Sequence, residues 1–490
     1  MFRRILRKVK KISITVLSVI RLSVIILPFL AALSLNVESV QNFAVRKAGS
    51  IITETLGTQV SMERIKIRGF SKLEAKGFYV QDLAGDTLIY AGTLTGNISK
   101  TALTRRKLII GDITLEDGRI YLHKPENGDM NIQEVLDTFL DRDRERKGRT
   151  DILLRDIYIS GTRFKLQIDG RDSIASDRMN FGNLIFDGLT VGSHNLAIKG
   201  QRISMNLYGM SFTDVSGFKV DLLETEEFVI DQGLLDFTNT SIKTPDSYLT
   251  LPDIKLDGYG NWKRFSSFTD SVRMDVALNN SDVHSRTLSY IIPWIPRQAD
   301  IMLNGADLTF TGTVNDFNGE LKNIVTGGTR LHGTYAVKGV TDIKKAWFDL
   351  DIPSLSTDAF RLENLAYEFL SQEPDTAIIN MLHRAGNMEM ALTAVAEMNN
   401  FDADLNLSSP LGGIAAKAEI SSAVNNGIKF DGTVEVEGFE LGRLLATNTL
   451  GERYVNGKLS GTVSNGKIDA QRNGRVPSIQ CNANNNRNSW

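Results

Sequence analysis

The chain has 490 residues and a formal net charge of -2, which excludes the strongly basic surface typical of nucleic-acid-binding proteins. Its charged fraction of 23% and its ten prolines argue against a wholly disordered chain. Its single cysteine, Cys481, excludes an intrachain disulfide.

The first predicted element is an apolar run over residues 12–35, preceded by a cluster of arginines and lysines within residues 3–11. As a helix this run is long enough to cross a bilayer core of about 30 Å. The basic flank predicts that the N-terminus stays in the cytoplasm and that the rest of the chain crosses the membrane. Residues chosen to represent this anchor are Ile12, Val16, Ile20, Val24, Leu27 and Leu30. A cleavable signal peptide is the alternative, because Ala32-Leu33-Ser34 resembles a cleavage site.

Residues 36–59 carry apolar side chains at three- to five-residue intervals, which predicts a helix. From Val60 the apolar period changes towards two, which predicts strands. The clearest case is residues 107–124, where Ile113, Leu115, Ile120 and Leu122 alternate with polar residues around Asp117-Gly118. This pattern predicts a hairpin with a two-residue turn and the four apolar residues on one face.

A helix capped by Asn131 is predicted next, followed by a charged linker over residues 141–149. Strands then resume and repeat an earlier pattern. Ile157, Ile159, Phe164 and Leu166 follow Ile113, Leu115, Ile120 and Leu122 at a constant offset of 44 residues.

Alternating strands continue through most of the remaining chain, with helices expected only over residues 361–370 and 441–447. No alternation of strands with helices is present, so a parallel doubly wound sheet is not expected. One interpretation is a stack of antiparallel sandwiches. The other is a mostly β fold, in which an N-terminal transmembrane helix precedes an elongated, curved sheet whose apolar face forms a groove. The expected groove-lining residues are Ile113, Leu115, Ile120, Leu122, Val272, Met274, Val276, Leu278, Leu405 and Leu407.

No catalytic, cofactor-binding or metal-binding site is expected. Residues 461–467 resemble the first part of a phosphate-binding loop, but Ile468 stands where a magnesium-binding Ser or Thr is required. The five histidines lack metal-ligand spacing, and Cys481 has no histidine near it in the sequence. A non-enzymatic protein is therefore predicted.

The chain resembles the N-terminal portion of the TamB-type translocation and assembly proteins, within the AsmA-like family. The resemblance rests on the basic segment and anchor, on KLEAKGFYVQDLAGDTLIY (residues 72–90) and on residues 434–466. It implies a β-taco-like groove that carries phospholipid between the inner and outer membranes. It also implies a single-pass protein of the bacterial inner membrane, with the bulk of the chain in the periplasm, and an outer-membrane barrel partner. The alternative that it implies is a scaffold that assembles outer-membrane proteins by β-augmentation.

The expected organisation is a basic segment and anchor (1–35), a helix (36–59), a β-groove (60–466) and a tail (467–490). The tail is rich in asparagine and loses the apolar alternation, which predicts a disordered or out-of-frame segment.

Overall fold

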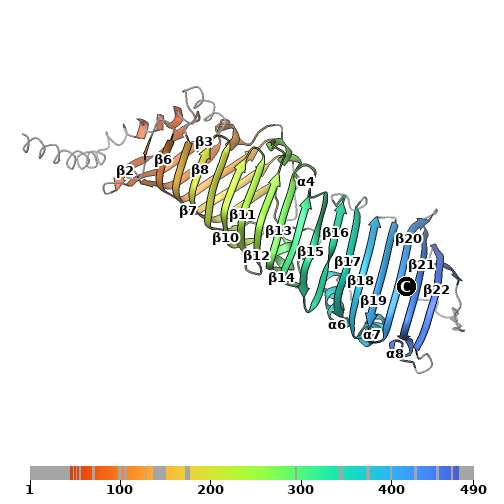
Figure 1. Cartoon of the computed structure of the whole chain (residues 1–490). Coiled ribbons are helices and arrows are strands. Elements are labelled where there is room, and N and C mark those ends of the chain that lie inside the picture. Colours follow the sequence, from red (N-terminus) through yellow and green to blue (C-terminus); the bar gives the residue numbers. More distant parts are fainter. Residues whose placement is uncertain are drawn as a thin grey trace, which may run out of the picture. The chain divides into compact units, whose positions relative to one another are not determined.

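Long antiparallel strands dominate the structure, as the period-two alternation predicts (Figure 1). It is a computed structural model that describes residues 43, 45–47, 49–50, 52–54, 57–68, 72–97, 102–103, 107–126, 128–135, 151–170, 177–292, 295–340, 346–370, 376–397, 400–423, 427–447, 452–464 and 467–473. These residues belong to two compact units, Met1–Pro245 (unit 1) and Asp246–Trp490 (unit 2). The mostly β fold is confirmed. Among the described residues no helix has the length and apolar character needed to cross a membrane, and the predicted anchor at residues 12–35 lies outside them.

Unit 1 consists of strands β1 to β11. Their bounds are β1 Val60–Ser61, β2 Arg64–Arg68, β3 Lys72–Gln81, β4 Thr87–Asn97, β5 Ala102–Leu103, β6 Lys107–Lys124, β7 Asp151–Ile168, β8 Asn183–Lys199, β9 Arg202–Asp214, β10 Lys219–Asp231 and β11 Leu234–Lys243. Strands β1 and β2 both pair with β3, and β5 pairs with β6. The remaining neighbours are antiparallel, except that β6 and β7 are parallel.

A hydrophobic core closes the beginning of unit 1. Val60, Val80 and Leu88 are at its centre, and Val45 and Ile52 from the helical residues near 43–54 pack against it. The predicted helix after residue 130 contributes a second cover, because Ile132 and Val135 join the same core. Buried Asn131 lies at the start of that helix, where its side-chain oxygen accepts from the Ile132 amide at 2.9 Å and from the His123 amide at 3.1 Å, and its amide group donates to Asp82 at 3.1 Å.

The hairpin predicted over residues 107–124 is wrong. These residues form one continuous strand, β6, which pairs along its length with β4 on one side and β7 on the other. Asp117 has a left-handed φ of 54°, so the Asp-Gly pair is an irregularity within a strand and not a chain reversal. The parallel register joins Ile113 to Ile157, so the 44-residue repeat is the register of two neighbouring strands.

Unit 2 is a meander in which each strand pairs antiparallel with the next in sequence. Its strands are β12 Tyr248–Asp257, β13 Arg273–His284, β14 Met302–Gly312, β15 Asp316–Thr326, β16 Thr329–Lys338, β17 Trp347–Asp358, β18 Asn387–Glu397, β19 Asn400–Ser409, β20 Gly412–Ala423, β21 Gly427–Glu440, β22 Glu452–Ser464 and β23 Lys467–Asn473. Its helices are η2 Trp262–Ser267, α4 Phe268–Ser271, α5 Ser285–Ser289, α6 Ala359–Leu370, α7 Thr376–Ala385 and α8 Leu441–Leu444.

Three helices of unit 2, α6, α7 and α8, lie at the same end of the strands from β17 to β22 (Figure 1). Helices α6 and α8 match the two that the sequence predicts, whereas η2, α4, α5 and α7 were not predicted. The predicted tail begins too early, because Lys467–Asn473 form β23 and pair with β22. Residues 474–490 lie outside the described residues.

Candidate functional site

One face of the unit 2 sheet is almost entirely apolar, because strand register brings apolar residues opposite one another from strand to strand. Val276 pairs with Phe310, and Leu278 pairs with Leu308, which in turn pairs with Leu321. We call this surface the apolar face. Its members are Met274, Val276, Leu278, Leu308, Phe310, Phe317, Leu321, Tyr335, Val337, Phe348, Leu350, Leu392, Ala394, Ala396, Phe401, Ala403, Leu405, Leu407, Ile414, Ala416, Ala418 and Ile420.

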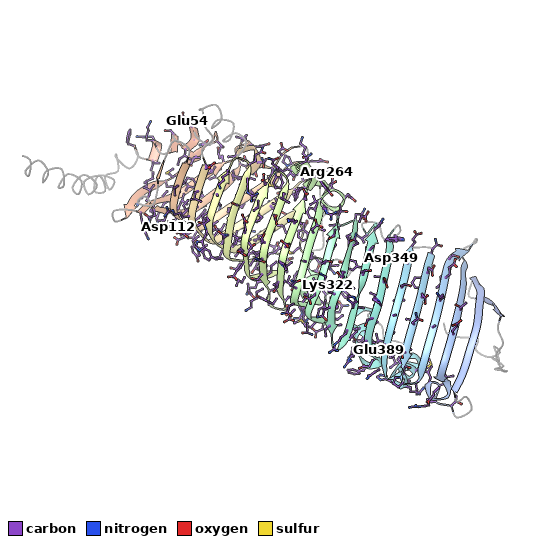
Figure 2. The ribbon with its side chains drawn as sticks, in the orientation of Figure 1. Glu54, Asp112, Arg264, Lys322, Asp349 and Glu389 are labelled. Atoms are coloured by element: carbon purple, nitrogen blue, oxygen red, sulfur yellow. The ribbon has the colours of Figure 1, made fainter. Side chains whose placement is uncertain are left out.

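The other face of the same strands is polar, because side chains alternate across a strand. Register aligns Asp404 with Lys417 there, and the two charged groups form an ion pair at 2.6 Å. That ion pair raises the pKa of the Lys417 ammonium, first through the hydrogen bond to Asp404 and then through its negative charge. Side chains stand out along the strands, and Lys322 and Asp349 are labelled among the charged ones (Figure 2). The sheet of unit 2 is therefore amphipathic, because polar side chains suited to water lie on one face only.

In the described part of unit 2, helices cover the apolar face near one end of its strands, and Leu288 of α5 packs in one cluster with Leu278 and Leu308. Leu407 and Ile414 pack against a core that includes Leu362 of α6 and Leu382 of α7. Beyond this cover the face is mostly half-buried. Phe401 and Ile420, which pair across β19 and β20, are 38% and 36% exposed. The described strands of unit 2 follow one another within a single meander and belong to one sheet.

The predicted groove residues of unit 2 occupy this face, with one exception. Met274, Val276 and Leu278 lie on β13, and Leu405 and Leu407 lie on β19, all on the apolar face. Val272 precedes β13, caps the C-terminal end of α4 and is fully buried, with 0% exposure. It is therefore a core residue of the α4 junction, a role that alternation along the sequence could not reveal.

The predicted residues of unit 1 all lie on β6. Ile120 pairs with Ile89 of β4, Leu115 is buried, and Leu122 packs against the hydrophobic core at the beginning of the unit. Ile113 is half-buried and pairs with Ile157 of β7. The sequence did not single out an aromatic stack farther along the unit, where the rings of Phe186 and Phe212 lie 4.0 Å apart and those of Phe164 and Phe186 lie 5.3 Å apart.

No family model, curated protein or solved structure matches this chain.

Four histidines of the described region, His123, His194, His284 and His383, each contact a carboxylate, whereas His332 contacts the Lys322 carbonyl. His123 contacts Asp169 at 2.9 Å, and His383 contacts Glu363 at 2.8 Å. The hydrogen bond from His123, with a second one from Gln167, lowers the pKa of the Asp169 carboxyl. Within the described residues no group of three or more His, Cys, Asp or Glu side chains is placed to hold a metal ion.

A cleft of about 920 Å³ opens between the start of β14, the β15–β16 turn, α6 and α7. Its walls mix apolar residues such as Phe360 with charged ones such as Arg361. Arg361 is held by Asp358 at 3.2 Å and donates to the carbonyl of Gly328 at 3.1 Å, so its charge is already engaged within the protein.

Tyr335 supplies a polar group on the apolar face. Its hydroxyl donates to the Thr309 carbonyl at 2.9 Å, and its ring meets that of Phe317 edge-on at 6.1 Å. Burial raises the pKa of the Tyr335 phenol above its usual value of 10.0. The hydroxyl is therefore neutral and hydrogen-bonded at physiological pH, which is compatible with apolar surroundings.

We expect Tyr335 to make folding stability fall in alkali. As pH rises through about 10, the phenol loses its proton in the unfolded chain before it does so in the folded protein. The unfolded chain then binds fewer protons than the folded protein, so the free energy of unfolding decreases. Tyr335→Phe should reduce this decrease, while lowering stability at neutral pH by about 1 kcal/mol through loss of the hydrogen bond. Urea unfolding of both proteins between pH 7 and 11 measures the difference. Parallel curves would contradict the assignment.

Proposed function

We propose that the protein is a non-enzymatic carrier of phospholipid, and that acyl chains lie along the apolar face of unit 2. The observation that supports this proposal is the register, which aligns aliphatic and aromatic side chains from β13 to β20 and leaves residues such as Phe401 and Ile420 open. Large apolar surfaces that remain accessible to solvent mark sites for ligands, membranes or other proteins.

Acyl chains suit this surface because it offers apolar contact without a defined polar pocket. Each methylene group taken out of water contributes about 0.8 kcal/mol, so a chain gains affinity along its length without specific hydrogen bonds. A face that continues from strand to strand lets the chain slide, since successive positions are chemically alike. The regularity of Leu392, Leu405 and Ala416, which align across β18, β19 and β20, fits this requirement.

The resemblance to TamB-type proteins extends the proposal to location and direction of transfer. On that basis the protein is anchored in a bacterial inner membrane by residues 12–35 and carries phospholipid through the periplasm towards the outer membrane. A barrel partner in the outer membrane belongs to the same proposal.

Photo-crosslinking tests the proposal at β13. A photoreactive residue at Met274 should label co-purified phospholipid, whereas the same residue at Asp275 should not, because adjacent strand residues point to opposite faces. After extraction from the membrane, the protein is purified in detergent-free buffer. Labelled lipid is then identified by mass spectrometry. Equal labelling at the two positions, or absence of phospholipid from the purified protein, would overturn the proposal.

A further inference from the structure

We propose that Asn280 and Gly305 are positioning residues for the acyl chain, because they bend β13 and β14 so that the apolar face becomes the concave side. This inference rests on the proposed function. Both residues adopt the left-handed backbone region, with φ of 42° and 56°. Neither belongs to the apolar face itself.

The same local pattern recurs in five strands of unit 1. An inward apolar residue is followed two positions later by a left-handed residue, and the next residue then faces inward again. In unit 1 the left-handed residues are Gly77 in β3, Asp117 in β6, Gly161 in β7, Gly188 in β8 and Asn239 in β11. Glycine, asparagine and aspartate are the residues that tolerate this conformation best.

Each left-handed residue resets the alternation of its strand by one position. In β13 the apolar face is carried by Leu278 before Asn280 and by Val283 after it, and both side chains belong to one hydrophobic cluster. In β14 Leu303 precedes Gly305, and Leu308 follows it, again in that cluster. The register between β13 and β14 shifts at the same place. On either side of it, the pairs Leu278–Leu308 and Val283–Leu303 keep one register, so the irregularity lies at matching positions of the two strands. Like a β-bulge, such an irregularity bends the strands and increases their twist.

The inner side of the bend is crowded, whereas its outer side is open. Residues that directly follow the left-handed position are small and buried, with 0% exposure for Ser281 and Ala306 in unit 2 and for Thr162 in unit 1. The side chain of Asn280 itself is exposed. This asymmetry makes the side that carries Ser281 and Ala306 the concave one, and it is the side of the apolar face.

Side chains satisfy the backbone groups that the bend removes from the ladder. The Asn280 amide donates to the Asp307 carboxylate at 2.6 Å, and the Gly305 amide donates to the Asp282 carboxylate at 3.0 Å. On the inner side, the Ser281 hydroxyl accepts from the Thr250 amide at 2.9 Å. These contacts between neighbouring strands give the backbone amides at the bend hydrogen-bond partners and fix the bend in place.

A straight β13 would lose the concave wall. With a regular extended backbone at position 280, the side chains after it would change faces, and Val283 would leave the cluster that contains Leu278. An acyl chain on the resulting surface would contact protein on one side only. We therefore expect the bend to increase the contact between protein and lipid without contributing a lipid-contacting side chain of its own.

A substitution series at position 280 tests this role in the full-length protein. Asn280→Gly keeps access to positive φ and is the control, whereas Asn280→Val disfavours it strongly. We expect Asn280→Gly to retain phospholipid at the wild-type ratio and Asn280→Val to lose it about tenfold, which corresponds to about 1.4 kcal/mol. Phospholipid per protein is measured by mass spectrometry after identical purification. Equal retention in the two variants would overturn the proposal.

A second measurement that does not depend on lipid separates a failure of the bend inference from a failure of the proposed lipid function. In a Cys481→Ser background, Val283→Cys reports whether the side chain at 283, which is 3% exposed in the structure, stays inside. Maleimide should label it slowly with Asn280→Gly and rapidly with Asn280→Val. If wild-type protein holds no phospholipid but the two variants still differ in labelling rate, the proposed lipid function is wrong and the role of Asn280 in the bend is supported. If labelling is equally slow in both, the bend does not depend on position 280 and the inference fails.

Should Asn280→Val not fold, Gly305→Ala provides a milder disturbance of the same bend in β14. The expected order of phospholipid retention is then wild type, Gly305→Ala and, lowest, the double variant Gly305→Ala with Asn280→Ala. Retention that is equal in all three proteins would contradict the positioning role.

Discussion

Gly333→Val is expected to destabilise unit 2 by about 3 kcal/mol, the upper range for forcing extra atoms into a packed site. Gly333 is buried on β16, opposite Leu321 of β15. A Cβ atom at this position would lie 2.3 Å from the carbonyl oxygen of Asp351 and 2.9 Å from the Cα atom of Ile352. Both are backbone atoms of the neighbouring strand β17, so relief requires that the strands move apart.

Thermal and urea unfolding of the purified protein measure this effect, with Gly96→Val as the matched control. Gly96 also lies within a strand, β4, but a Cβ atom there would meet nothing within 4 Å. The control should therefore change the free energy of unfolding by less than about 0.5 kcal/mol. A loss of similar size in both variants would show that the close approach at Gly333 does not limit stability.

Leu405→Arg is expected to give the largest loss of lipid among changes on the apolar face, at least tenfold in phospholipid per protein. Leu405 lies in a regular part of the sheet, between Leu392 of β18 and Ala416 of β20. A guanidinium group without a partner among acyl chains costs several kcal/mol, and each 1.4 kcal/mol corresponds to a factor of ten. The backbone pairing of β19 stays available, because arginine keeps its amide donor and carbonyl acceptor.

Asn406→Arg is the control for this change, since Asn406 is exposed and belongs to the opposite face of β19. It adds the same charge one residue away and should leave lipid content unchanged. Mass spectrometry of lipid extracts gives the ratio, and circular dichroism verifies that both variants are folded. Loss of lipid in both variants would indicate a general effect of charge and would remove the support for an apolar lipid site.

The period of the apolar residues predicted the strands and most of the apolar face, because both depend on which side of a strand a side chain occupies. Met274, Val276 and Leu278 illustrate this, since alternation alone puts them together. Alternation does not predict which strands pair with one another in the sheet. The 44-residue repeat was visible in the sequence, but its meaning as a parallel register depends on β6 and β7 meeting in three dimensions.

Asp117-Gly118 shows the limit of local reasoning most clearly. A two-residue hairpin turn and a bulge within a strand both require left-handed backbone, so both select the same residues. The difference lies in the neighbours, because β4 and β7 run past this position on both sides and hold β6 extended. A similar argument applies to Val272, whose burial comes from its position at the junction of α4 and β13.

The meander of unit 2 has a consequence for how such a chain changes in length. Each strand pairs only with those that precede and follow it in sequence, as in repeat proteins whose modules contact their nearest neighbours. Inserting or deleting two consecutive strands restores the direction of every later strand, whereas one strand alone would reverse them all. A sheet of this kind can therefore be lengthened or shortened by whole hairpins, without a central core that has to be rebuilt each time.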